Sequence, residues 1–254
     1  MKAKIIFGIL LSFFVCSFSK ISAATAFNNE SLKYVITYKW GVIHKDAADA
    51  TLSLRRSGNE YKVMLTAKTK PWADKVFQVR DTLKGTIRVS DLKPLSYTKI
   101  THEKKKYARD EIKYSHLGNS VKATTKKIRE KKGKQTVDEF SLSATGPVYD
   151  MLSVFYYLRK LDYSQLNKNK IYTATIFSGS KKETIKIKSL GIETIELKNK
   201  TKQQAYHIKF NFTSDGGKKS SDDIDTWIST DDSHKPLYLV GKLPIGEVRA
   251  YIVQ

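Results

Sequence analysis

The sequence contains very little cysteine, because Cys16 is the only one in 254 residues. It lies in the apolar N-terminal segment that we interpret below as a signal peptide, so removal of that segment leaves a chain without thiols. Disulfides, thiol catalysis and cysteine metal sites are then excluded. In the alternative, Cys16 is lipidated and anchors the protein. Bacterial lipoprotein signals have a small residue before that cysteine, whereas this chain has Val15.

Familiar catalytic motifs are also missing. The chain has no G-x-S-x-G sequence, no glycine-rich phosphate loop and no S-x-x-K at the start of a helix. No two histidines share the spacing of a zinc site or a catalytic pair within one element. We therefore predict no catalytic activity, no cofactor and no metal site. A hydrolase without a familiar signature ranks last among the functions that we consider.

A long hydrophobic run occurs only at the N-terminus. Lys2 and Lys4 precede an apolar run over residues 5–15, and small residues follow at residues 22–24 and at Ala26. This pattern predicts a secretory signal peptide over residues 1–24, with cleavage anywhere from after Ala23 to after Ala26. The run is shorter than a membrane span of roughly 20 residues. We expect an exported protein in the periplasm or on the periplasmic face of the outer membrane, with no transmembrane segment after cleavage.

Negative charge is scarce, since 46 Lys and Arg face 25 Asp and Glu. Loss of three signal-peptide lysines leaves 43 against 25, a net charge of +18. The excess is greatest over residues 99–134, where 13 basic residues against 4 acids give +9. This surface either meets an anionic lipid, a lipopolysaccharide or an envelope glycan, or is only a solvated face that resists edge-to-edge aggregation. We expect no nucleic acid partner for an exported protein.

Alternation of apolar and polar residues covers most of the chain and predicts β-strands. Four segments, PLSYTKITHE, YARDEIKYSH, SVKATTKKIR and KQTVDEFSLS, are joined by short turns and predict an antiparallel meander. Gly58-Asn59 predicts a hairpin turn. Residues 46–49 predict a polar break, and residues 76–89 predict a strand pair with a bend at Gly85. Gly191 predicts a bulge. With roughly 12 to 14 strands and no linker, we predict a single β-rich domain over residues 27–254. Its fold class is mainly β, a large antiparallel curled sheet that forms a half-barrel or two layers.

One passage, GPVYDMLSVFYYLRKLD from Gly146 to Asp162, has a helical period instead. Its apolar residues recur at i, i+3, i+4 and i+7 from Val148 and predict one substantial amphipathic helix packed on the apolar face of the sheet. This helix either belongs only to the core or also lines a cavity. In the second case, tyrosine hydroxyls would lie beside an apolar pocket, as in many ligand sites.

The order of these features resembles a bacterial family of unknown function, DUF3108. The resemblance rests on L-x-Y-x-x-x-Y-K-W-G from Leu32, D-L-K-P-L from Asp91, D-M-L-S-V-F-Y-Y-L-R from Asp150, and the closing T-W-I-S-T-D, P-L-Y-L and G-E-V-R segments. It covers residues 32–253. It implies an exported envelope protein with a β-rich domain and no established activity. Members often have a glycine in the first turn, where this chain has His44-Lys45-Asp46, so the geometry of that turn is open.

The function that we predict is a non-catalytic binding module for an amphiphilic or anionic envelope component. An envelope interaction or structural protein that uses its basic face is the alternative. In the binding module, aromatic side chains would contact the apolar part of the ligand and basic side chains its head group. The predicted ligand-binding residues are Tyr149, Tyr156, Tyr157, Lys122, Lys126, Lys127 and Arg129.

Overall fold

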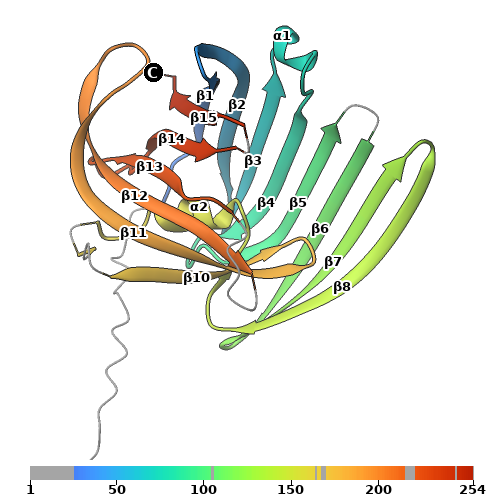
Figure 1. The fold of residues 1–254 in the computed structure, drawn as a ribbon. Helices are drawn as coiled ribbons and strands as arrows, with labels where there is room; N and C mark the ends of the chain where they lie inside the picture. The colour runs from blue at the N-terminus through green and yellow to red at the C-terminus, as the bar shows by residue number, and fades with distance from the viewer. Residues whose placement is uncertain are drawn as a thin grey trace, which may run out of the picture.

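The computed structural model describes residues 26–103, 106–163, 165–166, 170–214, 221–243 and 245–253. The predicted signal peptide lies outside these residues. Within them, the fold consists of fifteen β-strands and two short helices (Figure 1). No helix in the described part of the chain is both long and apolar enough to cross a membrane.

The first eight strands follow one another as antiparallel neighbours. They are β1 (Glu30–Trp40), β2 (Ile43–Ser57), β3 (Glu60–Thr69), β4 (Arg80–Arg88), β5 (Pro94–Glu103), β6 (Lys106–Leu117), β7 (Ser120–Lys131) and β8 (Lys134–Thr145), with helix α1 (Pro71–Asp74) after β3. Along β7, Val121, Ala123 and Thr125 are buried while Lys122 and Lys126 are exposed. The predicted meander and its lysine-rich outer face are therefore confirmed.

The remaining strands return to the start of the sheet. They are β9 (Val148–Tyr149), β10 (Ile171–Ser178), β11 (Lys181–Glu196), β12 (Lys202–Ser214), β13 (Ile224–Ser229), β14 (Pro236–Lys242) and β15 (Glu247–Ile252), with helix α2 (Ser153–Leu158) after β9. Strand β15 pairs with β1, which joins both series into one sheet with β8 and β9 at its edges. This sheet curls into a nearly closed, barrel-like shape around α2 (Figure 1). The predicted curled antiparallel sheet is confirmed.

Two local predictions in the first half were wrong. Residues 46–49 do not break the chain, because they pair with β1 as part of β2. Residues 76–89 contain one strand, β4, instead of two; Gly85 lies within it, and the pairing of β4 with β5 shifts register between Thr86 and Ile87. A Cβ atom at Gly85 would lie 3.3 Å from Cδ1 of Leu152, so this glycine allows α2 to approach the sheet closely.

The predicted bulge at Gly191 is confirmed. The pairing of β11 with β12 shifts register between Ser189 and Gly191, and Gly191 has a φ of 101°. Bulges bend a strand and increase its twist. The β11–β12 hairpin curves strongly, and its turn reaches the end of the molecule that carries α1 (Figure 1). This bend brings a basic turn next to β2.

The prediction of a substantial amphipathic helix was wrong. Val148 and Tyr149 form strand β9, parallel to β10, and the helix α2 contains only six residues. Asp150 starts the helix, because its Oδ1 accepts hydrogen bonds from the N–H groups of Leu152 and Ser153 at 2.7 and 2.8 Å. The apolar residues of a strand, a capping turn and a short helix gave the same pattern as one continuous helix.

The segment from β9 to α2 is buried on several sides instead of along one stripe. Leu152 and Tyr156 pack in a core with residues of β1–β7, whereas Tyr149 and Leu158 pack in a second core with residues of β10–β13. Arg159 is also buried. Its guanidinium pairs with Glu30 and donates to the carbonyl oxygen of Ser233 at 2.9 Å. The segment thereby connects the two halves of the sheet from inside.

Candidate functional site

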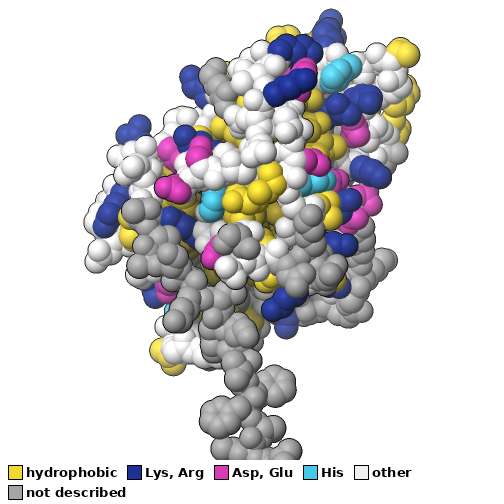
Figure 2. Space-filling view, turned by 90° about the vertical axis from the view of Figure 1, so that its left-hand side faces the viewer, with side chains coloured by type: hydrophobic (Ala, Val, Ile, Leu, Met, Phe, Trp, Pro, Cys, Tyr) yellow, Lys and Arg dark blue, Asp and Glu magenta, His cyan; other side chains and the backbone are white. Residues whose placement is uncertain are grey.

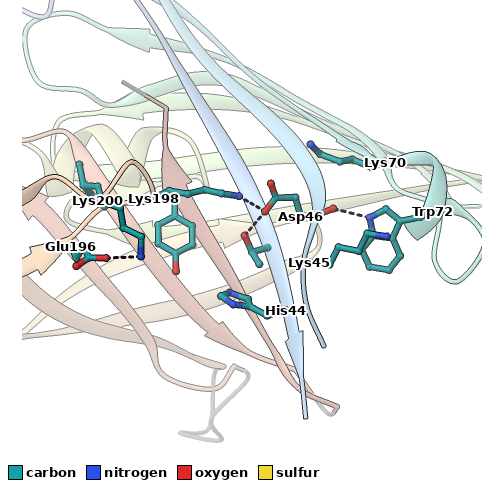
Figure 3. Close-up of a pocket in the computed structure, with 11 residues that line it drawn as sticks. His44, Lys45, Asp46, Lys70, Trp72, Glu196, Lys198 and Lys200 are labelled. Carbon is teal, nitrogen blue, oxygen red and sulfur yellow. Dashed lines mark hydrogen bonds and ion pairs between the residues drawn. The ribbon is translucent and has the colours of Figure 1, made fainter. Parts of the chain in front are cut away.

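A cleft of about 680 Å³ lies beside α1 and is lined by residues of β1, β2 and the β11–β12 turn. Figure 3 shows that its walls come from the start of β2, from α1 and from the β11–β12 turn. Four lysines and two acids contribute to these walls. They are Lys45, Lys70, Lys198, Lys200, Asp46 and Glu196, and Trp72 and Tyr251 add aromatic rings.

The fold brings these lysines together from three separate parts of the chain. Lys45 follows the β1–β2 turn, and Lys70 stands between β3 and α1. Lys198 and Lys200 lie in the β11–β12 turn, which reaches the cleft because of the bulge at Gly191. The ammonium group of Lys198 points toward Asp46 on β2 (Figure 3). The cleft therefore collects positive charge from two segments near the N-terminus and from a turn that lies 128 residues after Lys70.

The lysines of the cleft have exposed partners. Lys198 pairs with Asp46, with 40% and 36% of the two side chains exposed, and Lys200 pairs with Glu196 at 3.0 Å. The pKa of Asp46 is lowered, because hydrogen bonds from Lys198 and Thr37 outweigh the opposing effect of partial burial. Its carboxylate therefore stays ionised at neutral pH. Surface ion pairs of this kind contribute only about 0 to 1 kcal/mol, so the lysines can exchange these partners for another anion.

Aromatic rings form rigid parts of the cleft. Nε1 of Trp72 donates to the carbonyl oxygen of Asp46 at 2.7 Å, and Lys45 lies over the Trp72 ring at 4.9 Å. Tyr251 stacks on Tyr238 at 4.5 Å, and this stack continues across neighbouring strands to Trp227. Stacked rings across a sheet hold the backbone in place. The cleft thus combines movable ammonium groups with fixed apolar surfaces.

None of the three predicted tyrosines lines this cleft: Tyr149 and Tyr156 lie in the core, and Tyr157 is half-buried against it. Tyr149 is 4% exposed and stacks on Tyr157 at 4.5 Å. Tyr156 is fully buried, with its ring edge-on to Phe27 at 5.1 Å. Burial raises the pKa of all three hydroxyls. Their assignment as ligand-binding residues stays a prediction.

The four predicted basic residues lie on β7 and do not converge on one point. Lys122 and Lys126 are exposed, and Arg129 forms an ion pair with Asp110 at 2.6 Å. Lys127 lines a second cavity of about 310 Å³, together with Met151 and residues of the β10–β11 turn. In this cavity, Lys127 lies near Met151 of the segment that was predicted to be a helix.

Sequence reasoning missed the residues of the cleft. No motif marks them, because their spacing in the sequence is unrelated to their distance in space. The one available signal was Lys198-Asn199-Lys200, a basic turn after a strand with a predicted bulge. The distribution of surface charge does not mark a binding site either. On the face shown in Figure 2, basic and acidic side chains are intermixed around exposed hydrophobic ones. Among the described residues, no group of three or more His, Cys, Asp or Glu could hold a metal ion.

Comparisons with known proteins agree with this fold. A family model described as "Protein of unknown function (DUF3108)" matches residues 33–253, which confirms the resemblance seen in the sequence. A solved structure described as a β-barrel-like protein of domain of unknown function DUF1849, from Brucella abortus, is similar in fold. Its TM-score is 0.55 at 12% identity, over 91% of this chain and 98% of that chain. No curated protein matches.

Proposed function

The chain belongs to the DUF3108 family, and we propose that this protein is a non-catalytic binding module for the anionic head group of an amphiphilic envelope component. One observation carries the proposal, the convergence of four lysines from three segments on a cleft with two aromatic rings. The proposal includes export to the periplasm, which rests on the N-terminal sequence pattern alone. A phosphate or carboxylate head group is the chemistry that such lysines recognise.

The cleft lysines suit an exchangeable ligand. Their ion pairs with Asp46 and Glu196 are exposed and therefore weak, so an incoming anion can replace the carboxylates at low cost. Together with Asp49, which pairs with Lys70 at 3.4 Å, the two acids of the lining leave the four lysines with an excess of one positive charge. Trp72 and Tyr251 offer apolar surface for the part of the ligand next to its head group.

The lysines of β7 support this function less well than those of the cleft. Lys122 and Lys126 point outward four residues apart on one strand, and Thr124 between them is exposed as well. They present charge to the solvent without a cavity around it. We therefore propose that the head group binds in the cleft. The β7 lysines, which the sequence had suggested, serve as control positions in the binding experiment.

The proposal is tested by calorimetric titration with a short-chain phosphatidylglycerol that stays monomeric in solution. We expect wild-type protein to bind it more tightly than the zwitterionic phosphatidylcholine of the same chain length. The variant Lys45→Gln/Lys198→Gln/Lys200→Gln should lose affinity by at least roughly tenfold, because each ammonium group contributes up to about 1 kcal/mol in a solvated site.

The matched control is Lys113→Gln/Lys122→Gln/Lys126→Gln, which removes the same charge from exposed positions of β6 and β7. It should bind like wild type, within a factor of about two, since its lysines lie outside the cleft. Equal losses in the two variants would mean that net charge alone attracts the ligand. That result, or no binding by wild type, would refute the proposal.

A further inference from the structure

The turns at the end of the sheet that carries α1 expose an unusual amount of apolar surface. Fourteen large hydrophobic side chains are exposed in the described part of the chain, and seven of them lie at this end. They are Trp40, Val42, Ile43, Val76, Phe77, Leu243 and Ile245, each at least 41% exposed. Single exposed hydrophobic residues are common, but a group at one end of a molecule marks an interaction surface.

Two neighbouring turns form the centre of this surface, which we call the apolar tip: Trp40, Val42 and Ile43 in the β1–β2 turn, and Leu243 and Ile245 in the β14–β15 turn. Because β1 pairs with β15, the two turns lie side by side, with Lys39 opposite Glu247.

The backbone holds the apolar tip in place. The hydroxyl of Tyr38 donates to the carbonyl oxygen of Ile245 at 2.9 Å, and the N–H of Leu243 donates to the carbonyl oxygen of Gly246 at 3.0 Å. Gly246 has a φ of 81°, and a Cβ atom there would overlap the carbonyl oxygen of Lys39. Only glycine allows the two turns to lie this close. The exposed side chains are thus presented by ordered turns.

Positive charge surrounds the apolar tip. Residues 39–45 contain two lysines and no acid, and residues 242–249 contain Lys242, Arg249 and one acid, Glu247. The two turns and their flanks therefore have a net charge of +3. Lys39 and Arg249 pair with Glu247, at 4.0 and 2.5 Å. Apolar and aromatic side chains flanked by basic residues are features by which proteins bind to an anionic lipid surface.

We propose that the apolar tip docks this protein on an anionic lipid bilayer, with Trp40, Val42 and Ile245 inserted among the lipids and the flanking lysines at the head groups. The occupant is the bilayer surface itself and not a ligand of the cleft. The inference goes beyond the proposed binding function, because it rests on the exposed apolar side chains of the turns and shares only Lys45 with the cleft.

The position of the apolar tip also relates the bilayer to the cleft. Asp46 in the cleft is three residues from Ile43 along β2, a distance of about 10 Å at the rise of a β-strand. Side chains of interfacial elements enter a bilayer by about 5 to 10 Å. A docked molecule would therefore hold the cleft lysines near the level of the lipid head groups.

The experiment is flotation of the protein with vesicles of phosphatidylcholine alone or of phosphatidylcholine and phosphatidylglycerol in equal parts. Wild type should float with the anionic vesicles and much less with the neutral ones. The variant Val42→Asn/Ile245→Asn should lose at least roughly tenfold in partitioning, because it removes two apolar side chains from the contact. The charge stays unchanged in this variant.

The matched control is Leu117→Asn/Ile171→Asn, which removes two apolar side chains that are 80% and 59% exposed in other parts of the sheet. It should float like wild type. Bromine-labelled lipids provide a second measurement, because they should quench the fluorescence of wild type but far less that of Trp40→Phe.

Three results would overturn the inference: no flotation of wild type with protein-free anionic vesicles, equal flotation of both double variants, or equal quenching in Trp40→Phe. The first of these would assign the apolar tip to a protein partner. Binding of monomeric phosphatidylglycerol to the cleft is measured without vesicles, so failure of the docking and failure of the proposed function can be told apart.

Discussion

Ion pairs occur in two contrasting regions of this molecule, the interior next to α2 and the cleft beside α1. In the interior, the side chains of Arg159 and Glu30 are 1% and 15% exposed. In the cleft, those of Lys200 and Glu196 are 84% and 45% exposed. A buried pair resists the loss of one partner because the other charge then lacks both partner and water. An exposed pair can open and accept a new anion, so of these two regions the cleft is the one whose charges are available for a ligand.

The largest effect is expected in the interior, on the variant Arg159→Met. It leaves the carboxylate of Glu30 without its partner, and the carbonyl oxygen of Ser233 loses a donor. We expect the free energy of unfolding to fall by about 3 to 5 kcal/mol. Urea denaturation measures it. The double variant Arg159→Met/Glu30→Gln should recover part of the loss, and a cost below about 1 kcal/mol for Arg159→Met would contradict a buried pair.

A second interior charge should produce a pH dependence. Burial raises the pKa of Asp150 from 3.8 to about 6, and Oδ2 of this carboxylate has no hydrogen-bond partner among the described residues. As the pH rises, the Asp150 carboxyl therefore loses its proton at a lower pH in the unfolded chain than in the folded protein. The stability from this group is fully present below about pH 4 and is lost as the pH rises through about 6.

The variant Asp150→Asn removes this titration but keeps an oxygen that can accept from Leu152 and Ser153. Between about pH 4 and pH 7, wild type should lose about 2 to 3 kcal/mol relative to this variant. Urea denaturation at a series of pH values measures the difference. Asp138→Asn, in the exposed strand β8, is the control for the loss of one carboxylate. A constant difference for Asp150→Asn would mean that its carboxyl is not held neutral by burial.

The smallest effect on stability is expected in the cleft, for Asp46→Asn. The exposed pair with Lys198 contributes less than about 1 kcal/mol, so unfolding should change little. Affinity for monomeric phosphatidylglycerol should instead rise about fivefold, because one negative charge near the bound anion is removed. Calorimetric titration measures it, with Asp138→Asn as the control of equal charge change. Weaker binding by Asp46→Asn would show that the carboxylate itself positions the ligand.

Much of the sheet could be predicted from the sequence because its strands alternate and its turns are short. The meander, the hairpin at Gly58-Asn59 and the bulge at Gly191 all follow from local patterns. The helix over residues 146–162 could not be predicted correctly, because the spacing of apolar residues in a short segment does not separate a buried strand and turn from a helix. Pairing of β9 with β10 depends on residues far along the chain.

The cleft could not be predicted because nothing local determines it. Lys198 meets Asp46 only after the sheet has curled and the β11–β12 hairpin has bent over β2. From the sequence we instead predicted binding residues within the lysine-rich residues 99–134, where the exposed lysines of β7 point outward. Charge density is visible in a sequence, whereas convergence of charges requires the fold.

The most direct test of this account is NMR of the protein with its lysines dimethylated with carbon-13, titrated with monomeric phosphatidylglycerol and assigned by single Lys→Arg variants. We expect saturating shifts for Lys45, Lys198 and Lys200, and unchanged signals for Lys122 and Lys126. Shifts of Lys122 and Lys126 with the cleft lysines unchanged would contradict it.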